Sequence, residues 1–128
     1  MKDSSLEISI NGFRFAGVSC GIKPKTAAYG GRALDLALIV SDQPCRVAGV
    51  FTQNRFPAAP VLYDKGAIQA NPTGMRAVVI NSGNANACMG AQGESDALRM
   101  AKVVESALGL AAGTTLVMSC LLYTSRCV

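Results

Sequence analysis

The sequence predicts a single domain of the mixed α/β class, and three observations support this. The chain has 128 residues, which is enough for one domain with its own hydrophobic core. Half of the residues are hydrophobic and only 16% are charged, which argues against disorder. Short apolar stretches typical of strands accompany a segment, Glu94 to Leu108, whose apolar residues recur at helical spacing.

The N-terminal segment predicts a β-hairpin. Leu6 to Ile10 alternates apolar and polar residues, as an exposed strand does. Asn11-Gly12 is typical of a two-residue hairpin turn, so residues 13–22 are the expected partner strand. Residues 23–31 contain one Pro and two Gly, which favours a loop.

The next part of the chain predicts two further strands. Residues 33–40 are apolar apart from Asp35, which favours a buried strand. Residues 41–44, Ser-Asp-Gln-Pro, predict a turn, and residues 46–52 predict another strand. Residues 57–60, Pro-Ala-Ala-Pro, are expected to interrupt helix and sheet alike.

The second half of the chain combines helices and strands. The expected elements, in order, are a short helix within 63–74, a strand over 76–80, a helix over 94–108 and a strand over 114–118. Asn71-Pro72 would end the first helix. Glu94 and Asp96 are expected near the start of the second, where the helix dipole favours acidic groups, and Gly109 would end it.

Composition excludes several functions. The net charge is +4 and the 12 Lys and Arg are scattered, so no nucleic-acid footprint is present. Apolar runs are too short to span a membrane, and the N-terminus lacks the apolar core of a secretory signal. We therefore expect a cytoplasmic protein without nucleic-acid or membrane partners.

The chain has no His and five cysteines, at positions 20, 45, 88, 120 and 127. The absence of His excludes Ser-His-Asp and Cys-His catalysis, and His-ligated metals, within this chain. The cysteines are odd in number and lack Cys-x-x-Cys spacing, so we expect buried thiols rather than a disulfide framework or a metal site. We expect no cofactor. An acyl-transfer site without His can still use a Thr whose own α-amine is the base, once cleavage has made that Thr a chain terminus.

The stretch Asn81 to Gly90, Asn-Ser-Gly-Asn-Ala-Asn-Ala-Cys-Met-Gly, is the most informative part of the sequence. It joins a predicted strand to a predicted helix, and its small side chains would let a ligand approach the backbone. Free N–H groups in such a loop can face an anion or a developing negative oxygen. A polar connection built from turn-forming residues explains the composition equally well.

Residues 12–119 closely resemble the N-terminal part of the bifunctional ornithine acetyltransferases, also called glutamate N-acetyltransferases of arginine biosynthesis. The resemblance rests on the order and spacing of six stretches, each weak alone. They are residues 12–18 (GFRFAGV), 21–23 (GIK), 35–39 (DLALI), 47–54 (VAGVFTQN), 58–61 (AAPV) and 76–88 (RAVVINSGNANAC).

The resemblance implies an α/β sandwich of layered sheets and helices, in a polypeptide much longer than this chain. Family members cleave themselves before an internal Thr, which takes acetyl from N-acetylornithine and passes it to glutamate. Some also use acetyl-CoA as the acetyl donor. The two cleaved chains then assemble into a hetero-oligomer. On this basis residues 1–119 correspond to the opening part of the acetyltransferase.

Two departures from the family pattern stand out. The family forms its oxyanion hole with a Thr-Gly pair, which corresponds to Met89 and Gly90, so the hydroxyl donor is missing here. Asn81, Asn84 and Asn86 are the expected loop-shaping residues. Cys120 occupies the position of a family Thr that binds substrate. We interpret residues 120–128 as a tail foreign to the protein.

The resemblance therefore predicts an enzyme fragment that contributes the oxyanion-hole loop, lacks the nucleophilic Thr and is inactive alone. Two alternatives remain open. The loop could be part of a module that binds a small anion without chemistry, or the chain could be part of a related self-processing aminopeptidase. A sheet cut off partway also predicts unpaired strand edges, uncovered apolar surface and poor solubility.

Overall fold

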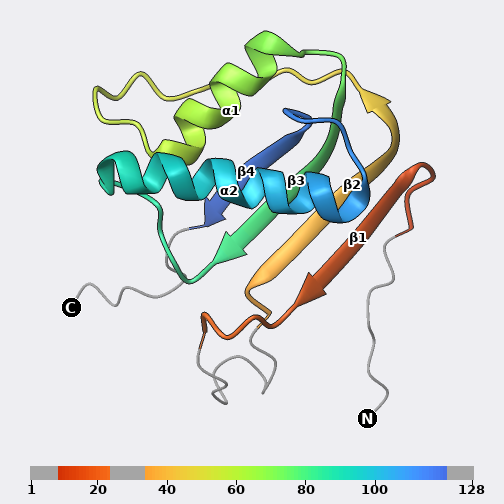
Figure 1. Cartoon of the computed structure of the whole chain (residues 1–128), viewed down its shortest axis with the longest axis horizontal. Coiled ribbons are helices and arrows are strands. Elements are labelled where there is room, and N and C mark those ends of the chain that lie inside the picture. Colours follow the sequence, from red (N-terminus) through yellow and green to blue (C-terminus); the bar gives the residue numbers. More distant parts are fainter. Residues whose placement is uncertain (1–8, 24–33, 121–128) are drawn as a thin grey trace.

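A computed structural model describes residues 9–23 and 34–120, and Figure 1 shows how their elements are arranged. These residues form four strands and two helices. In chain order they are β1 (Phe13–Val18), β2 (Leu36–Cys45), α1 (Ala59–Ala70), β3 (Met75–Ser82), α2 (Gly90–Leu108) and β4 (Thr115–Cys120). The mixed α/β class predicted from the sequence is confirmed.

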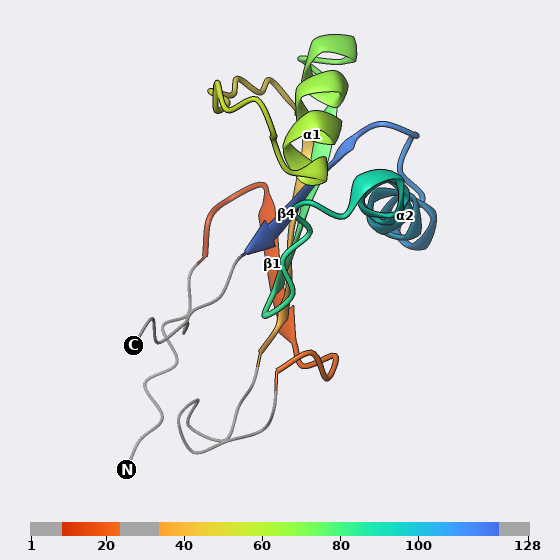
Figure 2. The same cartoon turned by 90° about the vertical axis from the view of Figure 1, so that its left-hand side faces the viewer.

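The strands form one sheet in the order β1-β2-β3-β4. The first two pairs are antiparallel, whereas β3 and β4 are parallel and α2 makes the crossover between them. Parallel neighbours need such a crossover because the chain must return to the same end of the sheet. Figure 2 shows the sheet edge-on, with α2 against one face. The carboxyl ends of β3 and β4 therefore lie together, beside the start of α2.

The core lies between α2 and the sheet. Its buried centre consists of Val79, Ala97, Ala101 and Val117. The two alanines are one helical turn apart, as the sequence spacing predicted, and their small side chains let the helix approach the sheet closely. Leu108 was expected on the same face but is exposed at the end of α2.

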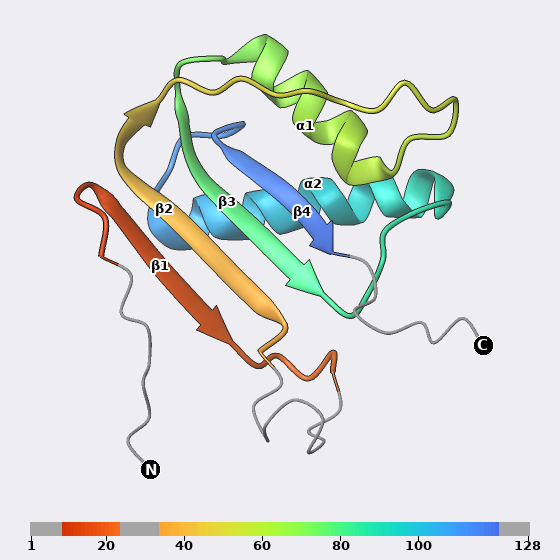
Figure 3. The same ribbon diagram turned by 180° about the vertical axis from the view of Figure 1, so that it is seen from behind.

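The opposite face of the sheet, seen in Figure 3, is not covered by either helix of the described residues. The strand register places a set of apolar side chains on this face: Phe13, Phe15, Ile39, Val78, Ile80, Leu116 and Met118. Phe13, Phe15 and Met118 are exposed. We call this set the open sheet face. It agrees with the uncovered apolar surface predicted from the sequence.

Helix α2 begins at Gly90, four residues earlier than predicted. Glu94 and Asp96 were expected near the start of the helix, but neither lies in its first turn. Glycine is a poor helix former, which is why the sequence pattern placed the start later. Packing explains the glycine at position 93, because a Cβ there would collide with Asn86 Oδ1 and would lie 2.9 Å from Met89 Cβ. The C-terminal end is as predicted, since Gly109 has a left-handed φ of 63°.

The predicted turn at residues 41–44 is also wrong, because β2 continues to Cys45 through an irregularity in its register with β3. Arg76 on β3 holds this segment: its guanidinium donates to the carbonyl oxygens of Ser41, at 3.0 Å, and Asp42, at 3.2 Å. The strand predicted over residues 46–52 does not form. These differences arise from cross-strand contacts that local turn chemistry does not contain.

Helix α1 shows why the prolines at 57–60 do not interrupt structure. Pro60 lies in the first turn, where a missing N–H costs nothing and the fixed φ suits a helix. The helix ends at Ala70 with Asn71 as its cap, as the Asn71-Pro72 pair indicated. The helix begins at Ala59, which is four residues before the predicted segment 63–74.

The N-terminal predictions are only partly covered by the described residues. The Asn11-Gly12 turn is present, with a φ of 83° at Gly12 and a bridge between Ile10 and Phe13. The partner strand ends at Val18 rather than at residue 22. Residues 6–8 and 24–31 of the predicted strand and loop lie outside the described residues.

The expectation of buried thiols is wrong for the cysteines that the structure describes. Cys20, Cys88 and Cys120 are exposed, and Cys45 is half-buried. Each lies in a loop or at a strand end, where the neighbouring core does not reach. Cys127 lies outside the described residues.

Candidate functional site

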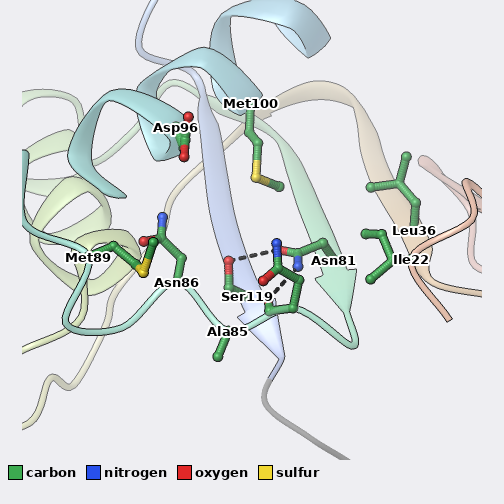
Figure 4. A pocket seen from close by; sticks show the side chains of 10 residues that line it. Ile22, Leu36, Asn81, Ala85, Asn86, Met89, Asp96, Met100 and Ser119 are labelled. Carbon is green, nitrogen blue, oxygen red and sulfur yellow. Dashed lines mark hydrogen bonds between the residues drawn. The ribbon is translucent and has the colours of Figure 1, made fainter. Parts of the chain in front are cut away.

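A cleft of about 270 Å³ lies between the N-terminal half of α2 and the carboxyl ends of β3 and β4. Figure 4 shows its side chains. The lining residues are Ile22, Leu36, Asn81, Asn84, Ala85, Asn86, Met89, Asp96, Met100 and Ser119. Crevices at the carboxyl ends of parallel strands are common ligand sites in α/β proteins. The cleft contains the three loop asparagines and Met89, which the sequence singled out.

Asn81 fixes the floor of the cleft. Its side chain is only 7% exposed, and its amide donates to the carbonyl oxygen of Asn84 at 2.7 Å. The hydroxyl of Ser119 donates to Asn81 Oδ1, also at 2.7 Å, as Figure 4 shows. Asn81 thus ties the start of the loop to the end of β4. Asn84 contributes its backbone carbonyl to this arrangement.

Ser119 was not among the predicted site residues. Its place follows from the register of the parallel pair, in which it stands opposite Asn81. Cys120, which was predicted to stand at a substrate-binding position, is the next residue of β4 and is exposed. Successive residues of a strand point to opposite faces, so Ser119 rather than Cys120 lines the cleft.

Asn86 joins the loop to helix α2. Its amide donates to the carbonyl oxygen of Gly93 at 2.8 Å, while its own Oδ1 is buried without a partner in the described residues. The close approach is possible only because residue 93 has no Cβ. The contact sets the position of the loop's end relative to the first turn of α2.

The backbone from Cys88 to Gly90 forms the start of α2. The φ angles are +58° at Cys88, −93° at Met89 and +59° at Gly90, with a ψ of 0° at Met89. Alternation of this kind turns successive N–H groups toward one side and creates a concavity that accepts anions. Gly90 is the first residue of the helix, so its N–H has no partner within the helix. This segment can stabilise a negative oxygen.

Met89 cannot add a donor to that concavity. Its side chain is 56% exposed at the mouth of the cleft. Gly90 has open space around its missing Cβ, so its positive φ rather than crowding favours glycine there. Cys88 adopts a positive φ without being glycine, which is a strained conformation and is frequent near functional sites.

The buried carboxylate of Asp35 holds the other wall of the cleft. It is 1% exposed and accepts backbone N–H groups from Cys20, Ile22 and Lys23 at 2.6, 2.6 and 2.9 Å. These hydrogen bonds, with one from the Cys20 thiol, hold the pKa of Asp35 well below its usual range. The same contact raises the pKa of the Cys20 thiol. The clamp places Ile22 in the cleft.

A second hollow, of about 210 Å³, lies on the α1 side and shares Asn86 and Ser119 with the cleft. Asp64 of α1 lines it and accepts the N–H of Val117 at 2.8 Å. This bond satisfies an N–H on the edge of β4 that faces away from β3. Burial raises the pKa of Asp64 to about 6.

The described part of the chain holds no group of three or more Cys, Asp or Glu residues suited to a metal ion. Neither of its helices is both long and apolar enough to cross a bilayer. The polar side chains that line the cleft are three amides, the hydroxyl of Ser119 and the carboxylate of Asp96.

Known proteins provide an independent comparison. The chain is 46% identical over 108 residues to the arginine biosynthesis bifunctional protein ArgJ of Thermotoga neapolitana. It is 48% identical over 109 residues to the mitochondrial ArgJ protein of Aspergillus clavatus. These alignments cover 84% of this chain but only 25% and 23% of the relatives, so the chain spans about a quarter of their length.

Solved structures give the same result. The ornithine acetyltransferase of Mycobacterium tuberculosis, crystallised in complex with ornithine, matches with a TM-score of 0.75 and 41% identity. That alignment covers 91% of this chain and 59% of the solved chain. ArgJ of Bacillus halodurans matches with a TM-score of 0.76 and 30% identity, over 89% of this chain and 56% of the solved one. Because residues 14–122 also match the ArgJ family as a whole, this chain belongs to the ArgJ family.

Proposed function

We propose that this chain supplies the oxyanion-binding loop of an enzyme that moves acetyl from N-acetylornithine to glutamate in arginine biosynthesis. The observation that carries the proposal is the concavity of N–H groups from Cys88 to Gly90, a segment that lines a hollow of about 220 Å³ and adjoins the amide-lined cleft at Met89. Membership of the ArgJ family and the ornithine complex of the M. tuberculosis relative support the substrate class.

In the proposed reaction a terminal Thr hydroxyl attacks the acetyl carbonyl carbon of N-acetylornithine. The Thr α-amine takes the hydroxyl proton and delivers it to the departing ornithine nitrogen. The carbonyl oxygen becomes negative in the tetrahedral intermediate and is stabilised by the N–H of Gly90. The glutamate amine then attacks the acetyl-threonine ester and releases the Thr for another cycle.

The Thr is absent from this loop and belongs to the self-cleaved second chain that the family resemblance implies. The chain alone is therefore inactive, and activity requires a hetero-oligomer of both chains. Acetyl-CoA is a further acetyl donor in this scheme, and the cytoplasm is the proposed compartment. The names of the fungal relatives include the word mitochondrial, which describes those proteins.

Met89 weakens the proposed hole because the side-chain hydroxyl of the family pattern is missing. Removal of one oxyanion donor typically lowers the rate by about 100- to 1000-fold. A test is to graft residues 14–119 into Thermotoga neapolitana ArgJ in place of the matching segment. Met89→Thr should raise the rate of N-acetylglutamate formation by about that factor, whereas Met89→Val, which has the shape of Thr without its hydroxyl, should not.

Equal rates for Met89→Thr and Met89→Val would refute the oxyanion assignment. Robust acetyl transfer by the 128-residue chain alone would refute the need for a second chain. The same backbone concavity also suits a module that binds a small anion without chemistry. Micromolar affinity of the isolated chain for acetate, phosphate or glutamate in a calorimetric titration would favour that second function. The family match favours acetyl transfer over a self-processing aminopeptidase.

A further inference from the structure

A groove runs between the N-terminal parts of α1 and α2, where Figure 1 shows the two helices starting close together and then diverging. It consists of two hollows. One, of about 220 Å³, contains the segment from Cys88 to Gly90, and the other, of about 360 Å³, extends to Leu98. Both are lined by Ala59 and Leu62 of α1 and by Glu94 of α2, so they form one continuous surface. We call this surface the helix groove.

The helical repeat explains the direction of the helix groove. Gly90, Glu94 and Leu98 follow one another at intervals of four residues, so they form one stripe along α2. Residues 59, 62 and 63 form the facing stripe on α1. The groove therefore follows α2 from the proposed oxyanion-binding segment to Leu98, over a rise of roughly 12 Å.

The helix groove exposes large apolar side chains that the described residues leave uncovered. Leu62 is 46% exposed, Leu98 is 42% exposed and Phe56 is 83% exposed. Exposed apolar side chains that gather around one hollow mark an interaction site, whereas scattered ones do not. Glu94 is the one charged side chain that lines the groove, and it has no hydrogen bond or ion pair with the described part of the chain.

The occupant of the helix groove follows from its position and its charge. The relatives are about four times as long as the matched segment, so most of such a polypeptide lies outside this chain. The proposed reaction brings the Thr of the second chain to the N–H of Gly90, which lies at one end of the groove. The carboxylate of Glu94 disfavours an anionic small molecule along the groove. The exposed leucines favour an apolar peptide instead.

We propose that the helix groove is the docking surface for the N-terminal segment of the self-cleaved second chain. This inference rests on the proposed function, which places the terminal Thr at Gly90. The roughly 12 Å from Gly90 to Leu98 corresponds to about four residues of extended chain. The segment therefore comprises the Thr and the three residues after it, whose apolar side chains pack on Leu62 and Leu98. This packing holds the Thr hydroxyl beside the oxyanion-binding N–H groups.

Photo-crosslinking tests the position of the second chain. The protein is Thermotoga neapolitana ArgJ with residues 14–119 of this chain grafted in place of the matching segment. Leu98→p-benzoylphenylalanine should crosslink to the first few residues of the second chain, which mass spectrometry identifies. The same residues are the expected partner if the grafted precursor remains uncleaved. Val103→p-benzoylphenylalanine is the matched control, because Val103 is 60% exposed on α2 and does not line the groove.

A second measurement determines how strongly the groove holds the second chain. Leu98→Glu places a charge in the apolar contact, so it should weaken association of the two cleaved chains by about 30-fold or more, measured by gel filtration over a dilution series. Leu98→Met keeps the contact apolar and should retain association. Val103→Glu adds the same charge outside the groove and should leave association unchanged. Circular dichroism of each variant verifies that the helices remain folded.

The proposal is overturned if Leu98 crosslinks to a different part of the second chain, to a second copy of the protein or to nothing. It is also overturned if Leu98→Glu and Val103→Glu weaken association equally. Failure of the proposed function is a separate result, because it would be seen as equal acetyl transfer by the two Met89 variants. The crosslink from Leu98 to the start of the second chain would persist in that case.

Discussion

Gly93→Ala tests whether the contact between Asn86 and helix α2 positions the candidate loop. A Cβ at this position would collide with Asn86 Oδ1 and would lie 2.9 Å from Met89 Cβ and 3.4 Å from Ala59 Cβ. Relief of such crowding in a packed interior costs about 1–3 kcal/mol. Replacement of Gly by Ala within a helix contributes about 1 kcal/mol in the opposite direction. The net expectation is a loss of up to about 2 kcal/mol of unfolding free energy.

Gly66→Ala in α1 is the matched control. Nothing lies within 4 Å of a Cβ at Gly66, so only the helix-propensity gain applies. This variant should become more stable by about 0.5–1 kcal/mol. The measurement is urea denaturation of both variants at low protein concentration, followed by circular dichroism. The two changes should therefore shift the denaturation midpoint in opposite directions.

A double-mutant cycle separates crowding at Asn86 from other effects of Gly93→Ala. Asn86→Ala removes the closest atom, so the loss caused by Gly93→Ala should be smaller in that background. If Gly93→Ala stabilises the chain as Gly66→Ala does, the loop is not fixed through this contact. Asn86 would then have no role in positioning the start of α2.

Three further predictions concern pH and solubility. Burial raises the pKa of Asp64 from 3.8 to about 6, so the folded chain holds this proton more tightly than the unfolded chain. The stability of the fold should therefore decrease as pH rises from about 4 to 6. Asp64→Asn should remove this pH dependence and stabilise the chain by about 1–2 kcal/mol at neutral pH, after allowance for solvent screening. Asp35 should show the opposite pH dependence, because folding lowers the pKa of its carboxyl group. Its contribution to the stability of the fold should be present above about pH 4 and lost in stronger acid. Asp35→Asn should lower the urea midpoint at neutral pH, because the carboxylate that accepts three backbone N–H groups is lost. The exposed apolar side chains of the open sheet face should cause the chain to associate. The double variant Phe13→Ser, Phe15→Ser should shift gel-filtration elution toward the monomer. A sharp monomeric peak for the unaltered chain would contradict this association.

Local patterns in the sequence were sufficient for elements whose periodicity agrees with their packing. The helix face containing Ala97 and Ala101 and the strand leading into the loop follow from spacing alone. Patterns failed where a distant group decides the structure. Arg76 donates to a backbone carbonyl of residues 41–44 and holds them in β2, although their sequence is typical of a turn. Asn86 leaves no room for a Cβ at Gly93, the glycine that made the start of α2 unfavourable by helix propensity. Neither contact can be inferred from neighbours in the sequence.

The candidate site divides in the same way. The composition of residues 81–90 predicted a loop that could present its backbone to a ligand, and the three asparagines do line the cleft. Ser119 and Asp96 complete the lining from β4 and α2. Their positions depend on the register of a parallel strand pair and on where the helix begins. Because the helix start was predicted four residues too late, Asp96 was interpreted as a residue near the helix start instead of a wall of the cleft.

Met89 stands where the family pattern has Thr, so the proposed oxyanion hole lacks the one donor that a side chain would supply. The loop itself is held by Asn81, Asn86 and Ser119, and no hydrogen bond among the described residues uses the Met89 side chain. We therefore expect the backbone angles from Cys88 to Gly90 to persist when the residue at position 89 changes. Met89→Thr should then change the rate of acetyl transfer in the grafted enzyme while its urea midpoint stays the same. A large change in stability would mean that Met89 is a packing residue and that the loop geometry depends on it.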